Sequence, residues 1–156
     1  SMTPAVRVVE SARIPFETRE YTVRPDAESF GLEAAAALGL PPEQVFKTLV
    51  TRVDGRTLAL GLVPVHRTLG LKALAAALGG RRAEMAPVAD AERATGYVTG
   101  GISPLGQRKS LPTVVDVSVQ TLEWVCVSAG RRGLQLRLHP RDLIALTRGS
   151  IAAIAR

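Results

Sequence analysis

Two adjacent glycines in a glycine-rich loop are the first feature of the sequence that could do chemistry. Gly100 and Gly101 lie in the stretch 96–106, which holds four glycines and a proline and therefore cannot form a regular helix. Two backbone N–H groups with no side chains to shield them can bind an anion or a carbonyl oxygen. Composition alone favours a plainer interpretation, in which the stretch is a long connecting turn.

The second such feature is Lys47, which interrupts the apolar stretch 45–53. Both faces of this stretch are largely apolar, as is typical of an interior strand. Lysine is depleted in strands and is almost never fully buried without a partner. Lys47 therefore either extends its ammonium from a strand end into water or points it into a cleft, and the sequence favours neither.

The elements that must position these residues are predicted from periodicity, caps and turn signals. Helices are expected over 4–12, 31–38, 71–78, 87–95 and 140–147, with strands over 16–23 (including Tyr21), 45–53, 57–65, 82–85, 113–116, 124–128 and 134–138. The segment 150–154 is expected to close as a strand or a helical turn. Because strands outnumber helices and do not alternate regularly as βαβ units, we expect an α+β domain with a mixed sheet of six or seven strands and helices around it.

Composition bounds the class of protein. The 156 residues, 46% of them apolar, suit one domain over 2–156 with a core of Leu, Val and Ala, and Ser1 before Met2 resembles an expression scar. Aromatic residues at 4% are too few for a platform that stacks several bases. The net charge of +6 favours a polyanionic partner. No signal segment or membrane-spanning run is present, so the cytoplasm is the expected location.

The sequence is poor in catalytic nucleophiles. The one cysteine, Cys126, excludes intrachain disulfides, fits a reducing compartment and lies in an apolar strand as an expected inert core thiol. His66 at a strand end and His139 before a helix are expected to be surface or capping residues, and structural zinc is not expected. No nucleophile elbow, zinc-protease motif or Walker A loop occurs. Any catalysis must therefore use backbone or lysine electrostatics, with water or the substrate as the nucleophile.

Three stretches carry a resemblance to a known family. They are Val-Phe-Lys-Thr-Leu at 45–49, Gly-Tyr-Val-Thr-Gly-Gly-Ile-Ser-Pro-Leu-Gly-Gln at 96–107 and Val-Ser-Ala-Gly-Arg-Arg-Gly-Leu at 127–134. They resemble the signature stretches of the YbaK/EbsC family, the free-standing relatives of the editing domain inserted in bacterial prolyl-tRNA synthetases. The resemblance covers nearly the whole chain, and it implies that the mixed sheet is barrel-like.

The resemblance implies a Cys-tRNA(Pro) deacylase that works in trans, usually alongside prolyl-tRNA synthetase, without cofactor or metal. In that family the thiol of the substrate is thought to attack its own carbonyl, which releases a cyclic thiolactone and free tRNA. Lys47 would hold the reacting end by its terminal phosphate or carbonyl, and Gly100 and Gly101 would donate N–H groups to the carbonyl oxygen. The expected lining of the aminoacyl pocket is Tyr21, Phe30, Thr48, Ile102 and Ser128, and the expected tRNA contacts are Arg108, Lys109, Arg131 and Arg132.

One position departs from the family pattern. Gln135 stands where members often carry an acidic residue, and this difference could weaken or shift the choice of amino acid. Two other functions are compatible with the sequence. One is a deacylase for another mischarged amino acid, such as alanine or serine, that uses water as the nucleophile. The other is a non-catalytic module that binds tRNA or a synthetase.

Overall fold

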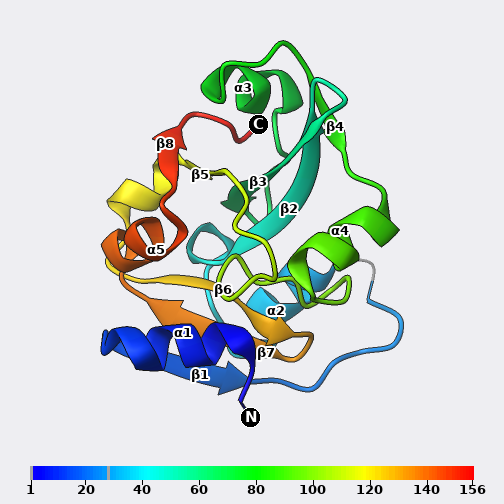
Figure 1. Cartoon of the computed structure of the whole chain (residues 1–156). Helices are drawn as coiled ribbons and strands as arrows, with labels where there is room; N and C mark the ends of the chain where they lie inside the picture. The colour runs from blue at the N-terminus through cyan, green and yellow to red at the C-terminus, as the bar shows by residue number, and fades with distance from the viewer. Residues whose placement is uncertain (1, 28) are drawn as a thin grey trace.

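The computed structural model describes residues 2–27 and 29–156, and its strands form two sheets (Figure 1). The three-stranded sheet has the order β1-β7-β6 and is antiparallel throughout. The five-stranded sheet has the order β4-β2-β3-β5-β8; its β3–β5 and β5–β8 pairs are parallel and the others antiparallel. The strands are β1 (Phe16–Glu20), β2 (Phe46–Val53), β3 (Thr57–Pro64), β4 (Ala83–Met85), β5 (Thr113–Asp116), β6 (Val125–Arg131), β7 (Leu134–Leu138) and β8 (Ser150–Ala152).

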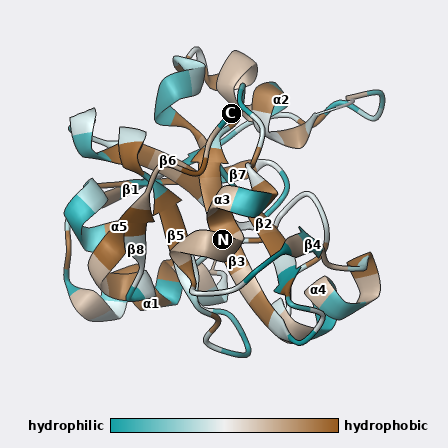
Figure 2. Ribbon diagram, turned by 90° about the horizontal axis from the view of Figure 1, so that it is seen from above, coloured by the Kyte–Doolittle hydropathy of each residue, from teal (hydrophilic) through white to brown (hydrophobic). Residues whose placement is uncertain are grey.

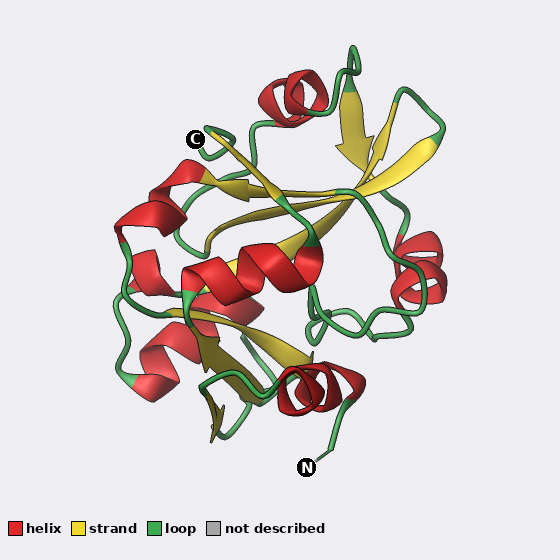
Figure 3. Cartoon of the chain, turned by 60° about the vertical axis from the view of Figure 1, so that its left-hand side comes forward, coloured by secondary structure: helices red, strands yellow, loops and turns green. Residues whose placement is uncertain are grey.

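Five α-helices in the described residues surround the strands (Figure 3). Their ends follow from local chemistry: the Thr3 and Ser29 side chains accept N-terminal N–H groups, and Gly39 and Gly96 end helices in the left-handed conformation. In the part of the chain that the structure describes, every helix is too short to cross a membrane. The helices are α1 (Pro4–Ala12), α2 (Phe30–Leu38), α3 (Leu71–Ala77), α4 (Val88–Thr95) and α5 (Pro140–Thr147), with 3-10 turns at Pro42–Gln44 and Val117–Thr121.

The main core lies where the two sheets face each other and α1 covers β6. It is built mostly from leucine and valine, as composition predicts, and hydrophobic residues follow the central strands in Figure 2. A fully buried side chain of this size contributes about 1.5–3 kcal/mol. The largest fully buried side chains of this core include Phe46, Leu60, Leu62, Leu134, Leu136 and Leu138.

The α+β class is confirmed, but the expected single barrel-like sheet of six or seven strands is wrong. The described residues form eight strands in two sheets, and no closed barrel is present. An isolated parallel bridge between Val45 and Cys126 joins the two sheets. Because strand pairing depends on contacts between distant segments, periodicity along the chain predicts the strands and not their grouping.

Two predicted boundaries near the cavity are also wrong. The strand predicted over 16–23 ends at Glu20, so Tyr21 follows the strand, and its N–H donates to Gly133 O at 2.9 Å. The strand predicted over 124–128 continues to Arg131 through a bulge that begins after Ser128. Gly130 and Arg131 therefore belong to the strand, and the chain reverses only at positions 132 and 133.

Candidate functional site

A cavity of about 260 Å³ lies between the two sheets and is lined mainly by apolar side chains. Val45 and the β2 residues from Phe46 to Val50 border it on one side. A cross-strand pair of the other sheet, Ser128 and Gln135, faces it from β6 and β7. The start of α2, the glycine loop and α4 complete the wall. Its volume is slightly below the roughly 300–1,000 Å³ of most small-molecule pockets, so it suits a small side chain better than a whole nucleotide.

Lys47 lies in the wall of this cavity, opposite Val63 in the β2–β3 ladder. Its side chain is half-buried, and no ion pair joins it to a carboxylate of the described residues. Burial lowers the pKa of the Lys47 ammonium because the charged form loses solvation. The location agrees with the interpretation that Lys47 faces a cleft, and the missing counter-charge leaves the ammonium available to an anion or a carbonyl.

Two buried polar atoms without partners also belong to this cavity. In the described part of the chain, the buried side-chain atoms without a hydrogen bond are Thr48 Oγ1 and Gln135 Oε1, and both residues line the cavity. Gln135 is only 7% exposed. An unsatisfied buried polar group costs about 1–3 kcal/mol, so this wall is suited to a ligand that donates hydrogen bonds.

The two glycines of the loop play different parts. Gly100 lines the cavity with φ +95°, and its N–H has no acceptor among the described residues. The Gly101 N–H donates to Val98 O at 2.9 Å, so the expectation that it is offered to a substrate disagrees with the structure. A side chain at Gly101 would lie 2.6 Å from the Arg131 backbone, which explains the glycine by close packing.

The rest of the loop is fixed by its own hydrogen bonds. Tyr97 is buried, and its Oη donates to Leu105 O at 2.7 Å. Burial raises the pKa of the Tyr97 hydroxyl to about 12, so it remains a donor at any physiological pH. The Gln107 side chain donates to Ser103 O at 2.8 Å. The stretch that could have been a plain turn is tied together by hydrogen bonds and forms part of the cavity wall.

All five residues predicted to line an aminoacyl pocket do line this cavity. They come from five different segments of the chain: the segment after β1, the first turn of α2, the strand β2, the strand β6 and the glycine loop. The five are Tyr21, Phe30, Thr48, Ile102 and Ser128.

The four basic residues predicted to contact tRNA differ in their surroundings. Arg108 and Lys109 are exposed at the end of the glycine loop, and neither forms an ion pair with a described residue. Arg131 pairs with Glu20 at 3.2 Å. Arg132 pairs with the buried Glu33 at 3.1 Å, so its charge is already matched.

The other reactive side chains lie outside the cavity wall. Cys126 is buried, and burial raises the pKa of its thiol to about 11, which agrees with the expected inert thiol. His66 is exposed, and His139 stacks on Trp124 with ring centroids 4.0 Å apart. No group of three potential metal-ligating side chains occurs in the residues that the structure describes.

Sequence reasoning missed several residues around the cavity. Met85 and Val88 line it and are 49% and 59% exposed, and no sequence signal separates them from ordinary surface residues. Glu33 was also missed, although a signal existed. It is the only charged residue of the helix Phe30–Leu38, and its side chain is only 3% exposed.

Comparison with known proteins identifies the family of the chain. Residues 25–146 match the family model of the aminoacyl-tRNA editing domain. A protein of Enterococcus faecalis, provisionally named Cys-tRNA(Pro)/Cys-tRNA(Cys) deacylase EbsC, is 37% identical over 97% of this chain and 92% of its own length. A crystal structure provisionally described as a trans-editing enzyme for prolyl-tRNA synthetase is 26% identical, covers 100% of this chain and 99% of its own, and has a TM-score of 0.81. A hypothetical protein at 20% identity shares the fold with a TM-score of 0.87, over 99% of this chain and 100% of its own.

Proposed function

The chain belongs to the aminoacyl-tRNA editing domain family, and from this premise we propose that it is a trans-editing deacylase of Cys-tRNA(Pro). The observation that carries the proposal is the combination of groups in one cavity. Among the described residues, Lys47 has no carboxylate partner for its ammonium, and the buried oxygens of Thr48 and Gln135 have no hydrogen-bond donor. An aminoacyl ester supplies what these groups lack, since it has carbonyl and phosphate oxygens for the lysine and an ammonium for the two acceptors.

Lys47 and Gly100 are proposed to act on the reacting end of the substrate. The half-buried ammonium of Lys47 holds the terminal phosphate or the ester carbonyl, where partial burial strengthens the interaction. The Gly100 N–H donates to the carbonyl oxygen as negative charge develops on it. Gly101 supports this arrangement by letting the loop approach the β6 backbone, and it donates no hydrogen bond to the substrate.

Thr48 and Gln135 are proposed to receive the α-ammonium group. Ammonium carries three donors, and two of them would satisfy Thr48 Oγ1 and Gln135 Oε1. Gln135 stands where a carboxylate is common in the family, so here the ammonium meets a neutral oxygen. Tyr21, Phe30, Ile102 and Ser128 then enclose the amino-acid side chain.

The chemical step needs no nucleophile from the protein. The cysteine thiol of the substrate loses its proton and attacks the ester carbonyl, which forms a C–S bond. The C–O bond to the tRNA ribose then breaks, and the ribose oxygen takes a proton, leaving free tRNA and a thiolactone that water later hydrolyses. This route fits the chain because neither the buried Cys126 nor the two histidines line the cavity.

Binding of the tRNA body is proposed to depend on exposed basic residues. The protein is further proposed to act in the cytoplasm, with prolyl-tRNA synthetase as its partner. The net charge of +6 and the exposed pair Arg108 and Lys109 support a salt-sensitive contact with phosphates.

The test is a deacylation panel with Cys-, Ala- and Ser-tRNA(Pro), each measured with and without the purified protein. We expect release from Cys-tRNA(Pro) only, and S-alkylation of the charged cysteine should abolish it because the blocked thiol cannot cyclise. Release of alanine or serine, or of S-alkylated cysteine, would favour attack by water on a small residue. Binding of tRNA without any release would favour a non-catalytic module.

A further inference from the structure

We propose that Arg132 is a positioning residue that fixes Phe30 in the wall of the cavity, and that it is not a ligand of tRNA phosphates. The proposal goes beyond the deacylase function and rests on it only for its activity readout. It reassigns a residue whose sequence context, a basic pair beside a glycine, suggested a phosphate contact.

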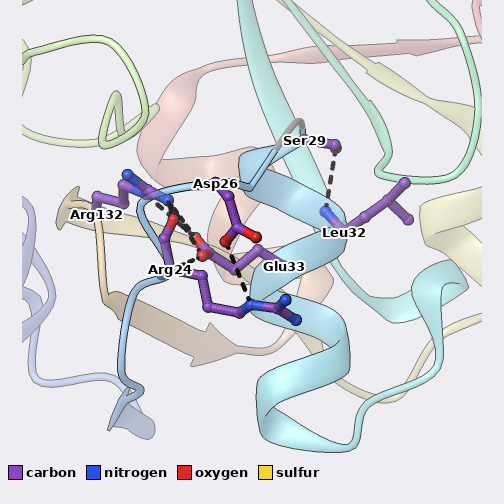
Figure 4. Close-up of polar contacts among 6 residues, drawn as sticks. All are labelled: Arg24, Asp26, Ser29, Leu32, Glu33 and Arg132. Atoms are coloured by element: carbon purple, nitrogen blue, oxygen red, sulfur yellow. Dashed lines mark hydrogen bonds and ion pairs between the residues drawn. The ribbon is translucent and has the colours of Figure 1, made fainter.

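The guanidinium of Arg132 is held by α2 and the segment before it (Figure 4). Arg132 Nε donates to Glu33 Oε1 and an Nη donates to Glu33 Oε2, both at 3.1 Å. The same Nη donates to Arg24 O at 2.6 Å, and Glu33 Oε2 also accepts the Arg24 N–H at 2.6 Å. The Glu33 side chain is 3% exposed, so removing the arginine would leave a buried carboxylate without its counter-charge.

The same guanidinium packs on Phe30. Its central carbon lies 4.6 Å from the centroid of the Phe30 ring, within the range of a cation–π contact. Phe30 is 37% exposed and lines the cavity, so little else covers its outer side. The ring also lies 3.4 Å from where a Cβ of Gly100 would be.

Arg132 therefore joins three parts of the wall. Its backbone N lies 2.7 Å from where a Cβ of Gly101 would be, so the turn after β6 touches the glycine loop directly. Its side chain holds the start of α2 through Glu33 and stacks on Phe30. The position of Phe30 relative to Gly100 is thus set by Arg132, which itself does not line the cavity.

This arrangement differs from that of Arg108, an exposed arginine without an ion pair among the described residues. A phosphate ligand changes the salt dependence of binding, because each neutralised phosphate releases counterions. Substitution of a positioning residue changes the rate of the reaction in the cavity, and it does so equally for a whole tRNA and for a short ester substrate. The two roles are therefore separable by experiment.

The experiment compares Arg132→Gln, Phe30→Leu, the double variant and Arg108→Gln on two substrates, Cys-tRNA(Pro) and the cysteinyl ester of adenosine. We expect Arg132→Gln to lower kcat/KM about tenfold on both substrates, with the salt dependence for tRNA unchanged. The double variant should be no worse than the poorer single variant, because both act on the position of one ring. Arg108→Gln should affect tRNA alone and lower its salt slope by about 1.

A second measurement is independent of activity. The chain has three phenylalanines, so the aromatic NMR signals of Phe30 can be assigned by comparison with Phe30→Leu. Arg132→Gln should shift the Phe30 ring signals and the Gly100 amide signal, whereas Arg108→Gln should shift neither. Phe30→Leu keeps the Arg132–Glu33 ion pair and provides the folded reference. If Arg132→Gln unfolds, Arg132→Lys takes its place, because lysine keeps the charge but lacks the planar guanidinium. Arg132→Lys should shift the same signals.

The outcomes that would overturn the proposal are specific. They are a loss confined to tRNA, a reduced salt slope, additive effects of Arg132→Gln and Phe30→Leu, or unchanged Phe30 and Gly100 signals. If the unmodified protein releases cysteine from neither substrate, the deacylase function fails, and the NMR comparison still decides the role of Arg132.

Discussion

Two regions of the molecule differ in whether their buried polar groups have hydrogen-bond partners. Asp116, at the end of β5, is 2% exposed and accepts four hydrogen bonds. The donors are Ser118 N and Oγ at 3.1 and 2.6 Å, Ile154 N at 3.0 Å and Ala155 N at 2.8 Å. In the cavity, Thr48 Oγ1 and Gln135 Oε1 have no hydrogen-bond partner within residues 2–27 and 29–156.

The difference separates polar groups that hold the fold together from polar groups kept for a ligand. Around Asp116 the donors come from the protein itself, and the hydrogen bonds from Ile154 and Ala155 hold the last residues of the chain against the sheet. In the cavity the chain accepts an unfavourable free energy that a bound substrate can offset. Substitutions at Asp116 should therefore change stability alone, whereas substitutions in the cavity should change stability and activity in opposite directions.

The largest expected effect is on activity, from Lys47→Met. Removing a single group that stabilises developing negative charge typically costs about 10²–10³-fold in rate. Stability should be retained or raised, because methionine fills the site without a desolvated charge. Because Lys47 has a lowered pKa, any gain in stability should be complete at neutral pH and should shrink as the pH rises through that pKa. Deacylation rates and urea unfolding measure both effects.

The matched control for that prediction is Lys72→Met, on an exposed lysine of α3. It should leave rate and stability nearly unchanged. A Lys47→Met variant that keeps more than a third of the activity would remove Lys47 from the proposed mechanism.

A smaller effect, on stability alone, is expected for Asp116→Asn, which puts an amide among four donors. We expect a loss of about 1–3 kcal/mol at neutral pH, with unchanged kcat/KM for the folded fraction. Burial alone would raise the pKa of Asp116, but hydrogen bonds from Ser118, Ala155 and Ile154 outweigh it and lower the pKa below 3.8. The stability from the carboxylate is thus present above that value and lost as the pH falls through the lowered pKa.

Urea unfolding between pH 7 and pH 2 checks this prediction. The gap between the unmodified protein and Asp116→Asn should be widest at neutral pH and should close in acid. A gap that is constant with pH would show that the ionised carboxylate is not the source of the stability.

The smallest expected effect is on the free energy of unfolding, when each of two threonines of β2 is replaced by valine. The two replacements are closely matched, so they give the sharpest comparison. Thr51 is buried, and its Oγ1 donates to Ala59 O at 2.9 Å, whereas the Oγ1 of Thr48 has no partner in the part of the chain that the structure describes. Valine at either position keeps the shape and removes the hydroxyl. Thr51→Val should destabilise the protein by about 1 kcal/mol, and Thr48→Val should stabilise it by a similar amount while lowering kcat/KM several-fold. Equal signs for the two changes in stability would mean that the Thr48 hydroxyl is satisfied in solution.

Local patterns in the sequence predicted the elements better than their arrangement. The proline and threonine that open α1, the Asp54–Gly55 turn between β2 and β3, and the alternation of β7 act within a few residues, so these elements were predicted closely. The separation into two sheets depends on which strands meet, and no local pattern carries that information. The ranges of β5 and α5 match the prediction residue for residue.

The candidate site divides in the same way. Lys47 and Gly100 could be singled out because each has a local signal: Lys47 is a charge in an apolar strand, and Gly100 is one of two adjacent glycines whose backbone N–H groups no side chain shields. The roles of Gly101 and Arg132 could not, because they depend on contacts between the glycine loop, the β6–β7 turn and α2. Arg108 and Arg132 differ in exposure and in their partners, because Arg132 pairs with Glu33 and contacts Phe30, and both properties belong to the assembled structure.

The pairing of β1 with β7 sets the order in which the cavity can appear during synthesis. Phe16 near the start of the chain pairs with Leu138 near its end, so the three-stranded sheet cannot form until almost all of the chain has left the ribosome. Closing so long a loop is entropically costly and slows folding. The nascent chain can complete β2 with Lys47 long before β6 and β7 arrive to cover it. Access to a chaperone, or slow translation after the glycine loop, would therefore affect the yield of active protein more than its final stability.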